Sequence, residues 1–93
     1  MKFEDLTFTP HPNDPSGVQA LAFFPNGFCA SVIRSSFSYG GRDGRYELAV
    51  GKGDAKDWCL TYDTRITSDV LGHLSEDAIT KLLRRIASLK PRP

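Results

Sequence analysis

A turn of three residues joins two runs that are rich in strand-forming side chains. Residues 18–24 read VQALAFF and residues 28–34 read FCASVIR, and only Pro25, Asn26 and Gly27 lie between them. Asn and Gly adopt positive φ values at low cost, as tight turns require. The sequence therefore predicts an antiparallel hairpin with strands over residues 18–24 and 28–34.

Further strands are predicted on both sides of this hairpin. RYELAV (residues 45–50) and WCLTY (residues 58–62) flank GKGDAKD, whose glycines and aspartates suit a second hairpin turn. KFEDLTF (residues 2–8) predicts an edge strand, and the proline-rich residues 9–17 predict a connecting loop. Together these segments predict a meander of four or five strands.

Period-two alternation divides the side chains of these strands between two faces. The face predicted to be the core carries Phe28, Ala30, Val32, Tyr46, Leu48, Val50, Trp58, Leu60 and Tyr62. The opposite face carries Cys29, Ser31, Ile33, Glu47, Ala49, Cys59 and Thr61. This second face is mixed in polarity, and we expect it to be wet or to pair with a second copy of the chain.

A helix is predicted at the C-terminal end, over residues 76–89. Ser75 suits the N-cap, and Lys90-Pro91 ends the helical pattern. Its apolar positions recur at helical spacing and comprise Ala78, Ile79, Leu82, Leu83, Ile86 and Leu89. Before it, residues 69–72 predict a short helical turn. We expect one α+β domain over residues 1–93, with an antiparallel four- to five-stranded sheet covered on one face by this amphipathic helix.

Composition limits the class of protein. A chain of 93 residues builds a single core. Its longest apolar run is far short of a membrane span, and MKFEDLTF resembles no export signal. Two cysteines without C-x-x-C spacing indicate free thiols in a reducing compartment, so the cytoplasm is the expected location. A net charge of +1 argues against a polyanionic mimic and against tight nucleic-acid binding.

Catalytic and metal sites are not expected. A cysteine enzyme would need His11 or His73 beside Cys29 or Cys59, and the sequence gives no sign of that pairing. The same scattered residues lack zinc-site spacing. Three acidic residues in or near the second turn, Asp54, Asp57 and Asp63, fit solvated turn positions better than a cation site. We therefore expect no catalytic residue, no metal and no cofactor, with a small cysteine-dependent enzyme as a remaining alternative.

The segment SSFSYGGRDGR, residues 35–45, is the candidate binding site. It is too long for a tight turn, and it mixes aromatic and basic side chains with glycine and serine. Such a composition is typical of recognition surfaces. The candidate partner-binding residues are Phe37, Tyr39, Arg42 and Arg45, together with Arg34 just before the segment. The competing interpretation is structural: Tyr39 folds over the sheet edge and the glycines reverse the chain.

Nucleic acid is an alternative partner for the same segment. Arginines and stackable aromatic rings are what single strands require, but the glycine-rich stretch lacks the ending of a P-loop. The basic side of the predicted helix would contribute Lys81, Arg84, Arg85 and Lys90. Those four charges also suit the C-terminal end of any solvated helix.

Four segments, FPNGF, SYGG, GRYELAV and CLTYDTRITSDVLGHLSEDAI, resemble a family of short uncharacterised proteins encoded by bacteriophages and prophages. The resemblance covers roughly residues 24–89. It implies a non-enzymatic protein that binds a host protein or ribonucleoprotein complex, such as a stoichiometric inhibitor of a bacterial defence complex of the CRISPR kind. It implies no catalytic residue, and it places the protein in the cytoplasm of the bacterial host.

Overall fold

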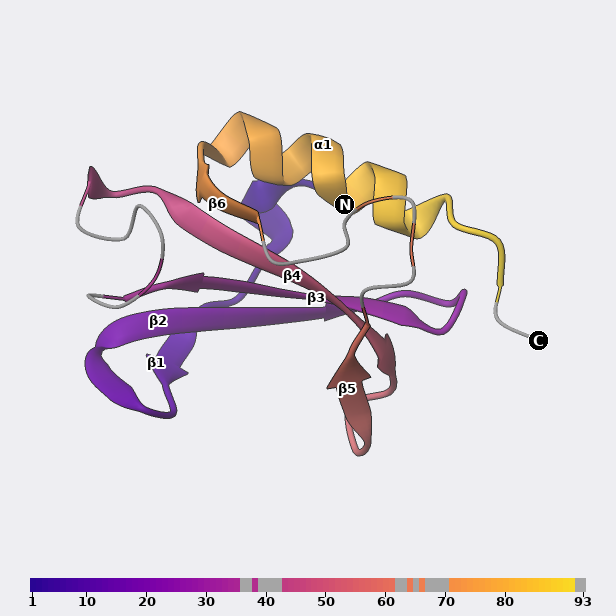
Figure 1. Ribbon diagram of the computed structural model, residues 1–93, viewed down its shortest axis with the longest axis horizontal. Helices are drawn as coiled ribbons and strands as arrows, with labels where there is room; N and C mark the ends of the chain where they lie inside the picture. Colours follow the sequence, from indigo (N-terminus) through magenta and orange to yellow (C-terminus); the bar gives the residue numbers. More distant parts are fainter. Residues whose placement is uncertain (36–37, 39–42, 62–63, 65, 67–70, 92–93) are drawn as a thin grey trace.

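The computed structural model describes the chain except for residues 36–37, 39–42, 62–63, 65, 67–70 and 92–93. Within the described residues, one sheet of six strands carries a single α-helix on one side (Figure 1). The elements in chain order are η1 (Phe3–Asp5), β1 (Thr9–His11), β2 (Asp14–Phe23), β3 (Phe28–Arg34), β4 (Tyr46–Gly53), β5 (Trp58–Leu60), β6 (Leu71–Leu74) and α1 (Glu76–Ala87).

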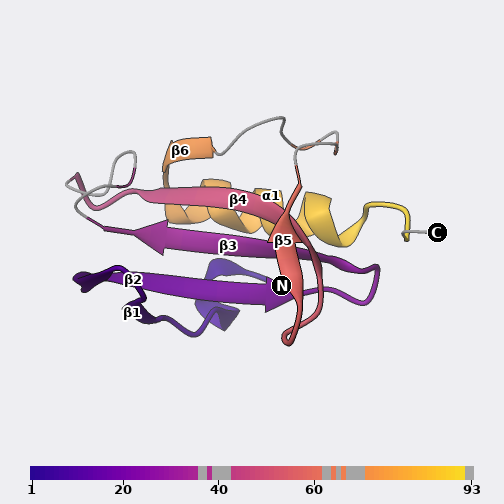
Figure 2. The same ribbon diagram turned by 60° about the horizontal axis from the view of Figure 1, so that its bottom comes forward.

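The sheet is antiparallel throughout, which confirms the predicted α+β fold. The strands follow the order β1-β2-β3-β4-β5, and β6 pairs with the same strand, β4, that pairs with β5. The predicted hairpin is formed by β2 and β3, with Ala22 opposite Ala30 and Ala20 opposite Val32. Figure 2 shows α1 behind this sheet, crossing the long strands at a shallow angle.

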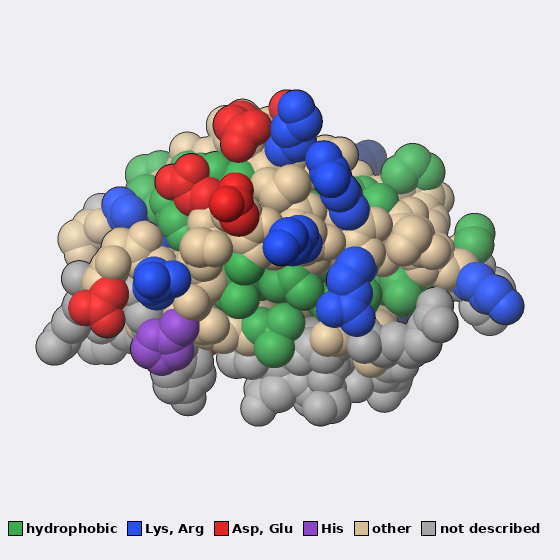
Figure 3. All heavy atoms as spheres, turned by 90° about the horizontal axis from the view of Figure 1, so that it is seen from above, with side chains coloured by type: hydrophobic (Ala, Val, Ile, Leu, Met, Phe, Trp, Pro, Cys, Tyr) green, Lys and Arg blue, Asp and Glu red, His purple; other side chains and the backbone are tan. Residues whose placement is uncertain are grey.

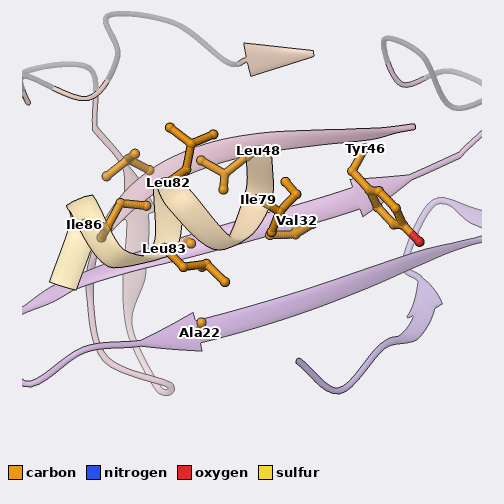
Figure 4. Packing of buried hydrophobic residues seen from close by; sticks show 10 residues of the cluster. Ala22, Val32, Tyr46, Leu48, Ile79, Leu82, Leu83 and Ile86 are labelled. Atoms are coloured by element: carbon orange, nitrogen blue, oxygen red, sulfur yellow. The ribbon is translucent and has the colours of Figure 1, made fainter. Parts of the chain in front are cut away.

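The core lies between α1 and the sheet. Ile79, Leu83 and Ile86 of α1 have no exposed surface, and Val32 and Leu48 beneath them have none either. Figure 4 shows these side chains converging from the helix and from the long strands. Burying each such side chain stabilises the fold by about 1.5–3 kcal/mol relative to leaving it in water. The apolar stripe read from the sequence is therefore what holds α1 on the sheet.

Both ends of α1 are capped. Ser75 is the N-cap, as predicted, and its hydroxyl oxygen accepts a hydrogen bond from the Ala78 amide at 3.2 Å. The helix ends at Ala87, two residues earlier than expected. Beyond it, the side-chain amide of Asn26 donates to carbonyl oxygens of the last turn. Thus the β2–β3 turn and the end of α1 are fastened together.

The strand predicted over residues 2–8 is wrong. Residues Phe3–Asp5 form a short 3-10 helix, because the Asp5 carboxylate accepts a hydrogen bond from the Lys2 amide at 2.8 Å and closes the turn. The Phe3 amide donates to the Thr80 hydroxyl of α1 at 2.9 Å. The Phe3 and Phe8 rings lie 5.0 and 5.7 Å from the Tyr46 ring. This segment closes one end of the core instead of extending the sheet.

Two further predictions, a connecting loop and a helical turn, are also wrong. Residues 9–17 were expected to connect strands, but they contain β1 and the beginning of β2, joined by the turn after His11. Residues 71–74 are strand β6, where a helical turn was expected over 69–72, and Asp69 and Val70 lie outside the described residues. Leu71 and Leu74 pair with Leu48 and Tyr46 of β4 and pack against the core, which outweighs any local helical preference.

Candidate functional site

The predicted binding segment is only partly described. Phe37, Tyr39 and Arg42 lie outside the described residues, so the structure leaves their part of the prediction untested. Arg34 precedes the segment and Arg45 is its last residue, and both are exposed. The Arg34 guanidinium carbon lies 5.5 Å from the centre of the Tyr46 ring, within the range of a cation–π interaction.

The sheet has a second surface, which we call the open face: the side opposite α1. Among the described residues no helix covers it, and Figure 2 shows it toward the viewer with β5 crossing one end. The register of the strands assigns its side chains to alternate positions. They are Gln19, Leu21, Phe23, Cys29, Ser31, Ile33, Glu47, Ala49, Trp58 and Leu60. Leu21 and Leu60, at 39% and 42% exposed, are the exposed large hydrophobic side chains of the described strands.

The position of Trp58 and Leu60 corrects the predicted core. Both were assigned to the face that α1 covers. In the structure Leu60 pairs with Gly51 and Trp58 pairs with Gly53, and paired residues point to the same side of a sheet. Gly51 shares its side with Ala49, so β5 presents its large side chains to the open face. The turn at residues 54–57 determines which residues of β4 and β5 are paired. The alternation of side chains within β5 alone cannot reveal that pairing.

A depression of about 220 Å³ lies on the open face. Its lining combines apolar and neutral polar side chains with one carboxylate, and comprises His11, Gln19, Ser31, Ile33, Glu47, Ala49, Trp58 and Leu60. The Gln19 side-chain amide donates to the Ser31 hydroxyl oxygen at 3.2 Å. His11 is held by its Nδ1, which accepts a hydrogen bond from the Asn13 amide at 3.0 Å. The depression is thus built from β1 to β5 and is held by internal hydrogen bonds.

Gly51 explains how the Trp58 ring reaches this surface. A Cβ atom at Gly51 would lie 2.7 Å from the Cys29 sulfur and 3.0 Å from the Trp58 ring carbon Cε3. Real Cβ contacts are longer than this, so only glycine lets the ring and the sulfur approach the β4 backbone. The tryptophan is therefore seated on the sheet by a specific backbone position.

The two cysteines lie in different surroundings. Cys29 has no exposed surface, and burial raises the pKa of its thiol to about 11, with the nearby Cys59 as a second cause. Catalytic cysteines need the opposite shift, toward a thiolate at neutral pH. Cys59 is exposed. The Cys29 thiol is therefore placed for packing, as small apolar side chains are.

Asp54 of the second turn has a structural role. The Asp54 carboxylate accepts hydrogen bonds from the Lys56 and Asp57 amides at 2.9 and 3.0 Å. Such bonds fix the loop conformation between β4 and β5. In the described part of the chain, no three His, Cys, Asp or Glu residues come together as metal ligands would. Asp63 lies outside the described residues.

Basic side chains gather over the middle and C-terminal half of α1, whereas acidic ones gather near its N-terminal end (Figure 3). Lys81, Arg84, Arg85 and Lys90 are all exposed. This arrangement follows the helix dipole, which favours negative charge at the N-terminus and positive charge at the C-terminus. The charge pattern therefore suits the helix dipole, and it also leaves a basic surface exposed.

Comparison with known proteins adds no functional information to that given by the candidate site. No family model, curated protein or solved structure matches the chain. No helix in the described residues is long and apolar enough to cross a membrane.

Proposed function

We propose that this chain is a non-enzymatic protein-binding module that docks through the open face of its sheet. The observation that carries the proposal is the exposure of Leu21 and of Leu60, which lines the depression, on a face that no described helix covers. Apolar side chains gathered around a depression on an uncovered face are a feature of protein interaction sites. The sheet behind it is packed on α1 through the core, and the interface backbone of preorganised complexes moves little on binding.

The size of the depression favours a protein partner over a small-molecule substrate. Its volume of about 220 Å³ is below the ~300–1,000 Å³ of typical ligand pockets. A protein partner needs only room for one anchoring side chain, since a few buried anchors carry most of the affinity of an interface. The raised pKa of the Cys29 thiol also gives no support to a cysteine-dependent reaction.

The identity of the partner rests on the resemblance to short bacteriophage and prophage proteins. On that basis we propose a host protein or ribonucleoprotein, specifically a defence complex of the CRISPR kind, inhibited by stoichiometric binding in the bacterial cytoplasm. The segment containing Phe37, Tyr39 and Arg42 would form a second contact region, with Arg34 and Arg45 exposed at its two ends.

The test is a pull-down from nuclease-treated lysate of bacteria that express a CRISPR effector complex, followed by titration of the purified complex. Leu60→Lys places a charge on the open face and Ala87→Lys places the same charge on exposed α1 surface as the matched control. We expect Leu60→Lys to weaken binding at least tenfold and Ala87→Lys to leave it unchanged. A Tyr39→Ala, Arg42→Ala double variant measures the contribution of the loop.

Two results would contradict the proposal. If Leu60→Lys and a second open-face variant, Leu21→Lys, both bind as the wild type does, the open face is not the docking surface. If only the loop variant loses binding, the sequence-based site replaces the structure-based one.

The exposed basic side chains on α1 favour one second candidate, a nucleic-acid-binding module (Figure 3). Its signature would be an affinity for single-stranded nucleic acid that falls steeply with salt. Reversing Arg84 and Arg85 to glutamate should abolish that affinity without affecting the protein complex. Binding that is insensitive to salt and to this reversal would remove the candidate.

A further inference from the structure

We propose that the depression on the open face accepts a single tyrosine side chain of the partner protein, with the phenol oxygen directed at Gln19 and Ser31. This inference deepens the proposed function and rests on it, because it names the chemistry of the anchor at the same surface. It follows from the volume, charge and hydrogen-bonding groups of the depression, and from the area of the face around it.

Volume sets the size of the occupant. An apolar cavity of about 150 Å³ is large enough to bind benzene. At about 220 Å³ the depression has room for a six-membered ring with a substituent. Trp58 and Leu60 of β5, with Ile33 of β3 and Ala49 of β4, supply apolar surface for such a ring.

Charge disfavours the ionised anchors. Glu47 is the only carboxylate in the lining, and it already has an interaction within the chain. Half of the lining residues are apolar, so an arginine or lysine entering here would exchange its hydration largely for apolar surface, which is costly. Interface anchors are most often Trp, Tyr or Arg, so neutrality leaves the two aromatic residues.

Hydrogen bonding favours tyrosine of these two. The Ser31 hydroxyl oxygen accepts from the Gln19 amide, and its own proton has no acceptor among the described residues. The side-chain oxygen of Gln19 likewise has no donor among them and is not buried. Gln19 and Ser31, which are hydrogen-bonded to each other, therefore offer one donor and one acceptor next to each other. A phenol can use both, whereas an indole N–H can only donate.

The area of the open face decides between a second copy and a different partner. The four strands β2 to β5 lie about 4.8 Å apart and average about seven residues, which at ~3.3 Å per residue gives roughly 450 Å². Each partner in a stable interface buries about 800 Å². The face alone is thus too small to hold a homodimer together, but it suffices for a projecting loop that inserts one anchor and makes further contacts outside the sheet.

The experiment titrates the ¹⁵N-labelled protein with p-cresol, which mimics a tyrosine side chain, and with toluene, which lacks the hydroxyl. We expect p-cresol to shift the side-chain signals of Trp58 and Gln19 and to bind about fivefold more tightly than toluene, as one or two net hydrogen bonds allow. Ser31→Ala and Gln19→Met should each bring this ratio close to one. Ser88→Ala removes a hydroxyl from the far side of the molecule and should leave the ratio unchanged.

Toluene binding as tightly as p-cresol to the wild type would overturn the inference, as would p-cresol shifts confined to other surfaces. Ser31→Ala and Gln19→Met test the same pair of hydrogen-bonding groups, so the inference can be tested even if one of them does not fold.

If Leu60→Lys weakens partner capture as expected while p-cresol binds no more tightly than toluene, only the tyrosine inference fails. If p-cresol binds as expected and Leu60→Lys does not affect partner capture, the docking function fails. If the ratio of the p-cresol affinity to the toluene affinity changes with protein concentration, the site is occupied by a second copy of the chain. That result would contradict its assignment to a separate partner.

Discussion

The side-chain amide nitrogen of Asn26, in the β2–β3 turn, lies 2.8 Å from the carbonyl oxygen of Ile86, sixty residues later in the chain. The same nitrogen lies 3.3 Å from the Ala87 carbonyl oxygen and 3.1 Å from that of Leu89. The last carbonyls of a helix have no partner within it, so one buried amide satisfies several of them at once. Its oxygen accepts from the Phe28 amide, which orients the group.

Replacing Asn26 with aspartate should destabilise the fold strongly. The carboxylate has the same shape, but it cannot donate and would set a negative charge against carbonyl oxygens in a buried position. We expect the free energy of unfolding in urea to fall by about 2 kcal/mol or more. Asn13→Asp, an exposed turn position, is the matched control and should change it little. Equal effects of the two substitutions would show that the cap contributes nothing.

Gly51→Ala should destabilise the protein and displace Trp58. The added methyl group would meet the Cys29 sulfur, the Trp58 ring and the Cys59 carbonyl oxygen at 3.0 Å or less. We expect a loss of about 1–3 kcal/mol and a change in tryptophan fluorescence. In a Cys29→Ala background part of the clash is removed, so the two substitutions should couple favourably by at least ~0.5 kcal/mol. Strict additivity in the double-mutant cycle would contradict this packing.

Stability should fall as the pH rises from about 9 to about 11. The Cys29 thiol has a pKa near 9.0 when exposed and about 11 when folded, mainly because of burial. Between these values the unfolded chain loses the proton and the folded chain keeps it, so the full contribution is present below pH 9 and declines above it. The expected slope is about 1.4 kcal/mol per pH unit. Urea unfolding at pH 8 and pH 10 measures it, and Cys29→Ala should reduce the pH dependence by that amount.

Thiol labelling should separate the two cysteines. Cys59 is exposed and should react readily with a disulfide reagent, whereas Cys29 is buried and should react only when the fold opens. We therefore expect one fast and one slow phase in the wild type. Cys59→Ala should abolish the fast phase and Cys29→Ala the slow one. A fast reaction of Cys29 would revive the cysteine-enzyme alternative.

Patterns within a single segment predicted much of the fold. The β2–β3 hairpin and α1 were found because their apolar residues repeat with the period of the element and because turn or cap residues bound them. Asn26 was read as a residue that tolerates positive φ. Among the described residues only His73 and three glycines have positive φ. Asn26 therefore contributes to the fold through its side chain. No local pattern points to a contact sixty residues away.

The candidate site was harder to predict because it depends on register. Ile33 and Ala49 were placed correctly on the second face, but Trp58 and Leu60 were assigned to the core because large apolar side chains are usually buried. A signal was present in the sequence. Gly51 and Gly53 stand two residues apart in an apolar strand, and glycine there indicates close approach of another group. That group is the β5 segment with Trp58.

The pairing of both β5 and β6 with β4 also affects how the protein avoids its own aggregation. One half of the β4 edge is occupied by three residues of β5 and the other half by residues of the four-residue β6. Two short, differently placed strands present no long row of unpaired amides and carbonyls to another chain. Polymerisation through this edge would require either short strand to be displaced first. The protein can therefore keep an apolar surface exposed on its open face while the sheet edge beside it resists templating.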